Sequence, residues 1–201
     1  MKKLILILLF IGPLFIFAQQ PKMDIRLYGG IHSSTFVYRA ENVDADMLIG
    51  WQAGGAFRVS RRKEFFEIDI TYVNSGITVA PNEDADIILE EPVEIRLHSL
   101  EIPMTIGYIP VKTTFFKWYL YGGLVSKFSL KGKYTYKGET ESFKPSELHI
   151  NWYNLGARIG SQVDVAFLNF DIGYTIGITN AFHSRVRTNT HALQFSVGFL
   201  F

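Results

Sequence analysis

Eight charged side chains occupy polar positions within otherwise apolar, alternating segments, and they are the residues of this chain best placed for chemistry. They can pair with one another or line a path for ions. A closed interior must pair its charges, whereas a water-facing surface need not, so their equal numbers favour an enclosed network. The four basic and four acidic residues are Arg26, Arg58, Lys127 and Arg158, and Glu67, Asp69, Glu101 and Asp171.

Histidine and serine offer a hydrolytic alternative. His32 and Ser34 share one face of their segment, and His183 precedes Ser184 in a polar stretch. Catalysis by a hydroxyl needs a nucleophile, a base and an orienting acid within mutual reach. The spacing assigns no complete triad, so no catalytic residue is predicted.

Two polar stretches carry clustered charge and predict loops. The acidic stretch contains Glu83, Asp84, Asp86, Glu90 and Glu91. Its spacing does not match the ligand positions of a calcium-binding loop, so a solvated loop is preferred and neither a metal nor a cofactor is expected. The basic stretch, residues 131–148, mixes lysines with tyrosines and suits phosphate groups or a protein partner. Its predicted recognition residues are Lys133, Tyr134, Tyr136 and Lys137, flanked by Lys131 and Lys144.

Period-two alternation predicts the elements that position these residues. The last stretch, Thr190–Phe201, shows it clearly, because a row of large apolar residues falls on one face, and small or polar residues as far as Gly198 fall on the other. Those apolar residues are Leu193, Phe195, Val197, Phe199 and Phe201. Seven further strands are predicted at 24–36, 49–58, 66–73, 93–108, 118–128, 152–162 and 168–178.

The predicted strands suit a membrane barrel. Most are near the 9 to 11 residues that cross a bilayer, and their connections alternate between long and short. Only helices and closed barrels satisfy every backbone group in hydrocarbon. We therefore predict an all-β fold, an eight-stranded antiparallel up-and-down transmembrane β-barrel over residues 19–201. A phase change in the fourth strand predicts a bulge near His98 and Ser99, and Pro103 predicts a further irregularity there.

A lipocalin-like secreted barrel would reverse the two faces, with apolar residues inside. Glycine among the polar-face residues favours the membrane version, because small residues suit a crowded narrow lumen. Aromatic residues near the strand ends also favour it, as interfacial girdles. They are Tyr108, Phe116, Trp118, Phe199 and Phe201 at the periplasmic side, and Phe36, Phe128 and Tyr153 at the outer side.

The N-terminal stretch has the layout of a secretory signal peptide. Lys2 and Lys3 precede an apolar run that is interrupted by Pro13 and ends near Ala18, so residues 1–18 are predicted to be cleaved. Removing them leaves 18 basic against 19 acidic residues, and nucleic acid is not an expected partner. The absence of cysteine excludes disulfides, thiolate metal sites and cysteine nucleophiles.

Two segments carry a resemblance to a known group. LEIPMTIGY, residues 100–108, and the terminal QFSVGFLF resemble the small PorT-like, porin-family outer-membrane barrels of Bacteroidetes. The resemblance implies an outer-membrane barrel, mostly without assigned activity, and one branch of the group is linked to protein secretion. The end of the chain also looks like a substrate of the barrel-insertion machinery, with Phe195, Val197, Phe199 and Phe201 as its signal.

These observations predict a non-enzymatic outer-membrane barrel whose lumen is largely filled. An eight-stranded barrel is just wide enough for its interior side chains to fill it, so Glu101 and Arg158 are expected to plug the lumen as a bidentate pair. The expected partners are outer-membrane lipid and lipopolysaccharide, the insertion machinery, and a protein bound through the outer loops. A barrel enzyme that modifies lipid A is the alternative, and a secreted lipocalin-like barrel is the second.

Overall fold

The computed structural model describes residues 21–37, 45–79, 93–136, 138–145, 151–179 and 189–201. The predicted signal peptide, the acidic stretch, and His183 with Ser184 lie outside the described residues. No helix among the described residues is long and apolar enough to cross a membrane.

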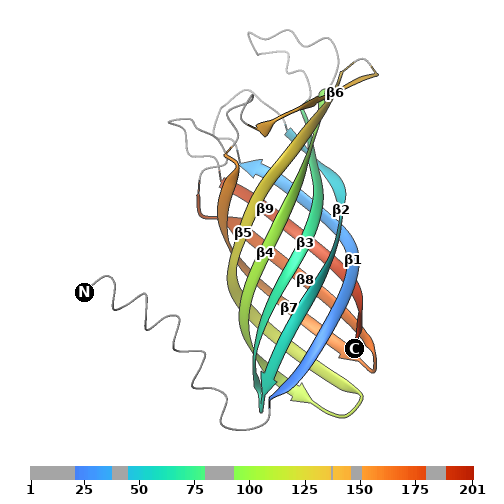
Figure 1. Cartoon of the computed structure of the whole chain (residues 1–201), viewed down its shortest axis with the longest axis vertical. Coiled ribbons are helices and arrows are strands. Elements are labelled where there is room, and N and C mark those ends of the chain that lie inside the picture. Colours follow the sequence, from blue (N-terminus) through green and yellow to red (C-terminus); the bar gives the residue numbers. More distant parts are fainter. Residues whose placement is uncertain (1–20, 38–44, 80–92, 137, 146–150, 180–188) are drawn as a thin grey trace, which may run out of the picture.

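Eight long antiparallel strands close into a barrel (Figure 1). Each pairs with its neighbours along the chain, while β1 pairs with β9 to complete the ring, and this confirms the predicted fold class. The barrel strands are β1 (Lys22–Val37), β2 (Ala45–Arg61), β3 (Glu64–Val79), β4 (Val93–Lys112), β5 (Phe116–Tyr136), β7 (Tyr153–Val165), β8 (Leu168–Gly177) and β9 (Asn189–Leu200).

Three short connections lie together at one end of the barrel, which we call the turn end. They are residues 62–63, 113–115 and 166–167. The start of β1 and the end of β9 lie at this end too (Figure 1). The opposite end, which we call the loop end, receives the long connections. The predicted alternation of long and short connections is therefore confirmed.

A ninth strand, β6 (Glu139–Phe143), replaces part of the predicted loop 131–148. β5 does not stop near Phe128 but continues to Tyr136 and turns back through β6, which pairs with Gly132–Tyr136. At about 3.3 Å per residue and a tilt of about 40°, a strand of this length rises about 50 Å, against a hydrocarbon core of about 30 Å. The β5–β6 hairpin therefore projects beyond the membrane (Figure 1).

The predicted bulge in the fourth strand is wrong. β4 keeps one register with β3 on both sides of His98, so Leu97 and Ser99 both face the interior. The irregularity at this level belongs to β5, where His98 pairs with Lys131 and Ser99 with Ser129, so Leu130 is the extra residue. An apolar Leu97 inside the barrel produced the apparent phase change in the sequence.

Pro103 coincides with a gap in the β3–β4 ladder. Pairing stops after Met104 with Ile68 and resumes at Glu101 with Thr71, so the ladder is interrupted where proline has no N–H to donate. Pro103 stays opposite Val125 of β5. The predicted irregularity is confirmed without any break in the barrel.

Apolar side chains point out of the barrel and polar ones point in. Ile172 and Leu193 are 52% and 53% exposed, whereas Asp171 and Arg158 are 5% and 3% exposed. This is the reverse of a lipocalin and matches a barrel whose outer face meets lipid.

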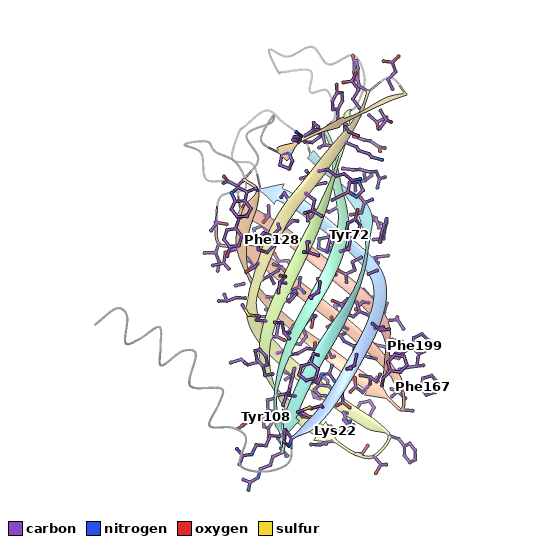
Figure 2. The ribbon with its side chains drawn as sticks, viewed as in Figure 1. Lys22, Tyr72, Tyr108, Phe128, Phe167 and Phe199 are labelled. Atoms are coloured by element: carbon purple, nitrogen blue, oxygen red, sulfur yellow. The ribbon has the colours of Figure 1, made fainter. Side chains whose placement is uncertain are left out.

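Aromatic rings gather near both ends of the outer face (Figure 2). Tyr108, Phe167 and Phe199 lie toward the turn end, and Phe128 and Tyr72 toward the loop end. Two of these rings, Phe167 and Phe199, stack with centroids 6.2 Å apart. The bands fit the aromatic girdles expected at the two membrane interfaces. The side chain of Phe36 lies outside the described residues.

Candidate functional site

A buried network fills the lumen toward the turn end, and Glu67 of β3 is its centre. The Glu67 carboxylate is 1% exposed and accepts hydrogen bonds from two guanidinium groups. Arg26 Nη2 donates to Oε1 at 2.9 Å, and Arg58 Nε donates to Oε2 at 2.6 Å. Gln162 Nε2 also donates to Oε1, at 2.9 Å. One carboxylate therefore joins β1, β2 and β7 across the lumen.

The two arginines carry this network to further strands. Arg26 Nη1 donates to Asn169 Oδ1 at 2.7 Å, and its Nη2 lies 3.5 Å from Asp69. Arg58 Nη1 donates to Asp164 Oδ2 at 3.0 Å, and Asn169 Nδ2 closes the circuit with Asp164 Oδ1 at 2.6 Å. Asp171 lies 3.9 Å from Arg26. We call this group the turn-end network: Arg26, Arg58, Glu67, Asp69, Gln162, Asp164, Asn169 and Asp171.

An apolar plug lies on the turn-end side of this network. Phe65, Ile109 and Tyr119 pack together inside the barrel and are at most 4% exposed. The Arg58 guanidinium lies 4.2 Å from the centre of the Tyr119 ring, a cation–π contact that joins plug and network. From the turn end inward, the lumen is therefore filled first by these apolar side chains and then by the ion-paired residues of the turn-end network.

Tyrosine hydroxyls extend the network away from the turn end. Tyr121 OH donates to Asp171 Oδ1 at 2.8 Å, and Tyr28 OH donates to Asp69 Oδ2 at 3.3 Å. Two glycines make room for Tyr121, because a Cβ atom at Gly160 would overlap its ring and one at Gly173 would lie 2.7 Å from its hydroxyl. The glycines noted on the polar face therefore serve the close packing of a narrow lumen.

A second group, the mid-barrel cluster of Glu101, Lys127 and Arg158, lies nearer the loop end. Arg158 Nη2 donates to Glu101 Oε2 at 2.9 Å, and its Nε donates to Thr175 at 2.9 Å. Lys127 Nζ lies 3.5 Å from the other Glu101 oxygen. Glu101 and Arg158 are paired as predicted, but the pair is not bidentate, because Lys127 and Thr175 take the remaining positions.

All eight charged residues predicted for the lumen lie on its inner face, divided between the two groups. Asp164, Gln162, Asn169 and Tyr28 were not predicted as members. Asp164 lies just beyond the predicted strand 152–162, although it continues the alternation Arg158, Gly160, Gln162. Continuing the alternation beyond the predicted end of this strand would have identified Asp164 as a residue of the inner face.

The predicted recognition residues divide between two faces of the β5–β6 hairpin. Lys133 is exposed, whereas the Tyr134 ring packs near Phe143, with centroids 6.3 Å apart, and its hydroxyl bonds Glu141. Tyr136 is half-buried, and Lys137 lies outside the described residues. Tyr134 therefore holds the hairpin together, and Lys131 and Lys133 are its exposed basic residues.

His32 and Ser34 lie inside the barrel at 0% and 7% exposure. Neither ring nitrogen of His32 makes a hydrogen bond to a described residue, so His32 and Ser34 do not form a base–nucleophile pair in the described part of the chain. The described residues also contain no group of three or more acidic or histidine side chains arranged to hold a metal.

Replacing Arg158 with leucine is expected to destabilise the barrel by about 1.5–3 kcal/mol, because it removes charged hydrogen bonds and leaves Glu101 with Lys127 alone. Equilibrium unfolding of the refolded protein in urea measures the change. Arg96, which is partly exposed at 37% and lies outside the network, supplies the matched control Arg96→Leu. Unchanged stability together with altered conductance would contradict a structural role for Arg158.

Residues 17–183 match the family described as outer membrane protein beta-barrel domain. The chain belongs to this family. Membership in this family implies that the protein resides in the outer membrane, and the apolar outer face of the barrel agrees with this location. No curated protein sequence shows significant similarity to the chain.

Two solved structures share the fold of this outer membrane β-barrel. The attachment invasion locus protein Ail of Yersinia pestis, in complex with the heparin analogue sucrose octasulfate, is 11% identical, with a TM-score of 0.50. The match covers 90% of this chain and 99% of Ail. Neisserial surface protein A is 12% identical, with a TM-score of 0.50 and coverage of 91% and 100%. At these identities the likeness concerns the fold alone.

Proposed function

We propose that this outer membrane β-barrel is a non-enzymatic, non-conducting protein that acts through its projecting hairpin and outer loops. The observation that carries the proposal is the double obstruction of the lumen. The Phe65–Ile109–Tyr119 plug and the turn-end network place buried apolar side chains and ion-paired arginines where a channel would need water. A barrel closed in this way is expected to bind partners through the parts that lie outside the membrane.

Conductance measurements test the closed lumen. The purified protein, inserted into a planar lipid bilayer in concentrated salt, is expected to give no steady single-channel current, while an open porin inserted under the same conditions gives one. A reproducible conductance step that scales with protein concentration would contradict the proposal. Heat-modifiable migration on a detergent gel verifies in parallel that the inserted protein is folded.

The hairpin is proposed to recognise anionic groups, either lipopolysaccharide phosphates or an acidic protein partner. Lys131 and Lys133 are exposed on its outer face, where β5 pairs with β4 opposite His98 and Arg96. Replacing both with alanine is expected to weaken binding to lipopolysaccharide micelles about 2- to 30-fold, since each of the two exposed ion contacts contributes about 0.2–1 kcal/mol. Surface plasmon resonance measures the change. Lys63→Ala with Lys112→Ala, at the turn end, is the matched control and should bind like the unmodified protein.

We also propose a place for this barrel among the PorT-like proteins of Bacteroidetes. The segments LEIPMTIGY and QFSVGFLF support it, and a role in protein secretion is the function that one branch of that group suggests. Secretion of cargo proteins by a strain that lacks the chain tests this role. Normal secretion by that strain would contradict a role in protein secretion.

Insertion into the membrane is proposed to depend on the outward row Phe195, Val197, Phe199 and Phe201. The exposed fractions of these side chains run from 38% to 73%, so they are free for a folding factor to bind before the barrel closes. Replacing Phe201 with serine is expected to slow assembly in vivo. The amount of heat-modifiable protein in the outer-membrane fraction measures it, and an unchanged amount would contradict the role.

The enzymatic alternative has a direct test. Lipid A from cells with and without the protein is expected to give the same mass profile. A difference in acyl chains or phosphates that disappears in Ser34→Ala would overturn the non-enzymatic proposal.

A further inference from the structure

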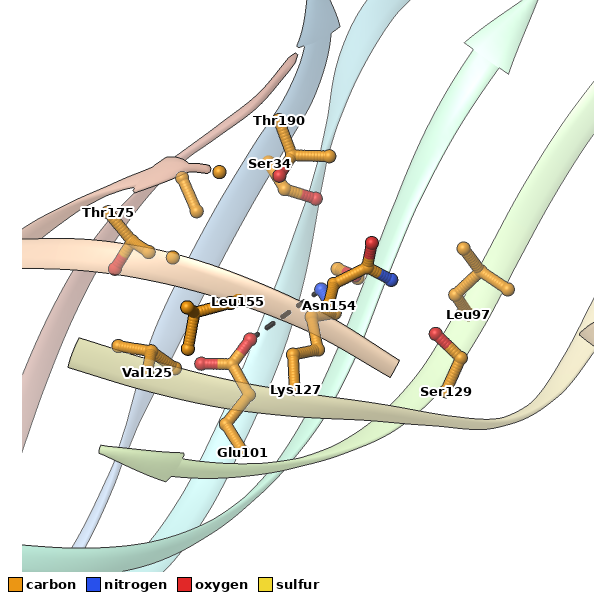
Figure 3. Close-up of a pocket in the computed structure, with 14 residues that line it drawn as sticks. Ser34, Leu97, Glu101, Val125, Lys127, Ser129, Asn154, Leu155, Thr175 and Thr190 are labelled. Carbon is orange, nitrogen blue, oxygen red and sulfur yellow. Dashed lines mark ion pairs between the residues drawn. The ribbon is translucent and has the colours of Figure 1, made fainter. Parts of the chain in front are cut away.

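The lumen holds a cavity on the loop-end side of the mid-barrel cluster (Figure 3). Its volume is about 50 Å³. Serine and threonine hydroxyls line one part of the wall, among them Ser34, Ser129 and Thr190. Carbon side chains line another part, among them Leu97, Val125 and Ala192. Since the turn end is blocked, the cavity is a closed-bottomed cup rather than part of a channel.

Lys127 is the cation that this cup presents. Its side chain is 23% exposed, whereas Glu101 and Arg158 beneath it are 5% and 4% exposed. Arg158 donates from Nη2 to Glu101 and from Nε to Thr175. The Lys127 ammonium lies 3.5 Å from one Glu101 oxygen, and an ammonium carries three N–H donors. Donors therefore remain for a ligand in the cavity.

The charge at the bottom of the cup favours an anion. Two cations, Lys127 and Arg158, share one carboxylate, Glu101, which lines the cavity beside Lys127, so the charge of Lys127 is only partly compensated there. A water molecule occupies about 30 Å³ of liquid and needs about 10–15 Å³ of free centre volume, so this cavity fits only a few non-hydrogen atoms. A phosphate dianion buried there would face a single accessible cation and carbon walls, which leaves part of its charge unpaired.

We propose that the cup binds a short-chain monocarboxylate, with Lys127 as its counter-ion. The carboxylate accepts hydrogen bonds from the Lys127 ammonium and from wall hydroxyls such as Ser34 or Thr190. The hydrocarbon end packs against Leu97, Val125 and Ala192. The site is independent of the basic hairpin, which lies outside the barrel wall.

Methyl NMR of the full protein in lipid nanodiscs tests the site, with propionate as the probe. Propionate is expected to shift the methyl resonances of Leu97, Val125 and Ala192 in a saturable manner. The Lys127→Met protein should bind at least about tenfold more weakly, because it loses a charge-assisted contact, and Lys127→Arg should keep most of the affinity. The matched control Lys133→Met, on the hairpin, should leave the dissociation constant unchanged.

Several results would overturn the proposal. They are an absence of saturable shifts, equal binding by Lys127→Met, or inorganic phosphate binding as tightly as propionate. If Lys127→Met does not fold, Ala192→Phe supplies a second test, because Ala192 lines the cavity and a phenyl group there would occupy it. Binding that persists in Ala192→Phe would place propionate elsewhere and would equally reject the site.

Discussion

Replacing Glu67 with glutamine is expected to lower the free energy of unfolding by about 3–5 kcal/mol, the cost of breaking a buried ion pair by removing one partner. The carboxylate neutralises Arg26 and Arg58 at once, and both guanidinium groups are 1% exposed. An amide of the same shape would turn its own N–H donors toward theirs. Equilibrium unfolding in urea, with the protein folded in lipid vesicles, measures the loss.

A matched substitution separates charge from strand effects. Glu64→Gln changes the same residue type three positions earlier on β3, where the side chain is exposed, and it should shift stability by less than about 0.5 kcal/mol. Equal effects at Glu64 and Glu67 would show that the turn-end network does not hold the barrel together.

Replacing Ile172 with arginine is expected to destabilise the folded barrel by about 2–4 kcal/mol, the cost of a cation on the lipid face near the bilayer midplane. Ile172 lies midway along β8, pairs with Phe195, and is 52% exposed on the outer face. The described residues that pair with Ile172, Ser161 and Phe195, carry no charge that could neutralise the arginine. The new side chain could reach water only by extending toward a membrane interface. The same unfolding assay in vesicles reports the change.

Depth along the barrel provides the control for this substitution. Val165→Arg places the same side chain on the outer face at the turn end, where the cost falls to about 0–1 kcal/mol. If Val165→Arg and Ile172→Arg were equally tolerated, the outer face would be meeting water and not lipid.

The period-two alternation was enough to predict the barrel, because one face of each strand is mostly polar and the other is mostly apolar. Asp171 lies between Phe170 and Ile172, and the lumen must take one kind of residue while lipid takes the other. The same alternation placed Arg26, Glu67 and Arg158 on one inner surface, although their positions are far apart in the chain. Closure of the sheet then brings them together.

Pairing partners could not be predicted in the same way. Which acid meets which base depends on the stagger between strands, and alternation along one strand carries no information about it. Arg26 therefore contacts Asn169, 143 positions away, a contact without a local signal. The three side chains that donate hydrogen bonds to Glu67 come from three different strands for the same reason.

Apolar residues inside the barrel misled the prediction of strand details. Leu97 faces the lumen, and counting it with the outer face produced a bulge in the wrong strand. Phe65 and Tyr119 likewise form a plug that a simple polar-inside rule does not anticipate. The β5–β6 hairpin was taken for a loop because Lys131, Lys133 and Lys137 suggest a solvated segment. Its other face is packed, because Phe143 is buried against Leu97.

The most direct test of the arrangement is quenching by spin-labelled lipid, read from methyl NMR signals in nanodiscs. The account predicts that doxyl-labelled lipid broadens the methyl signals of Ile106, Ile172 and Leu193, which are 52–67% exposed. The signals of Val73, Ile109 and Val125, at most 2% exposed, should stay sharp. Broadening of the second set with sparing of the first would contradict the account, because it would place lipid where the paired charges are assigned.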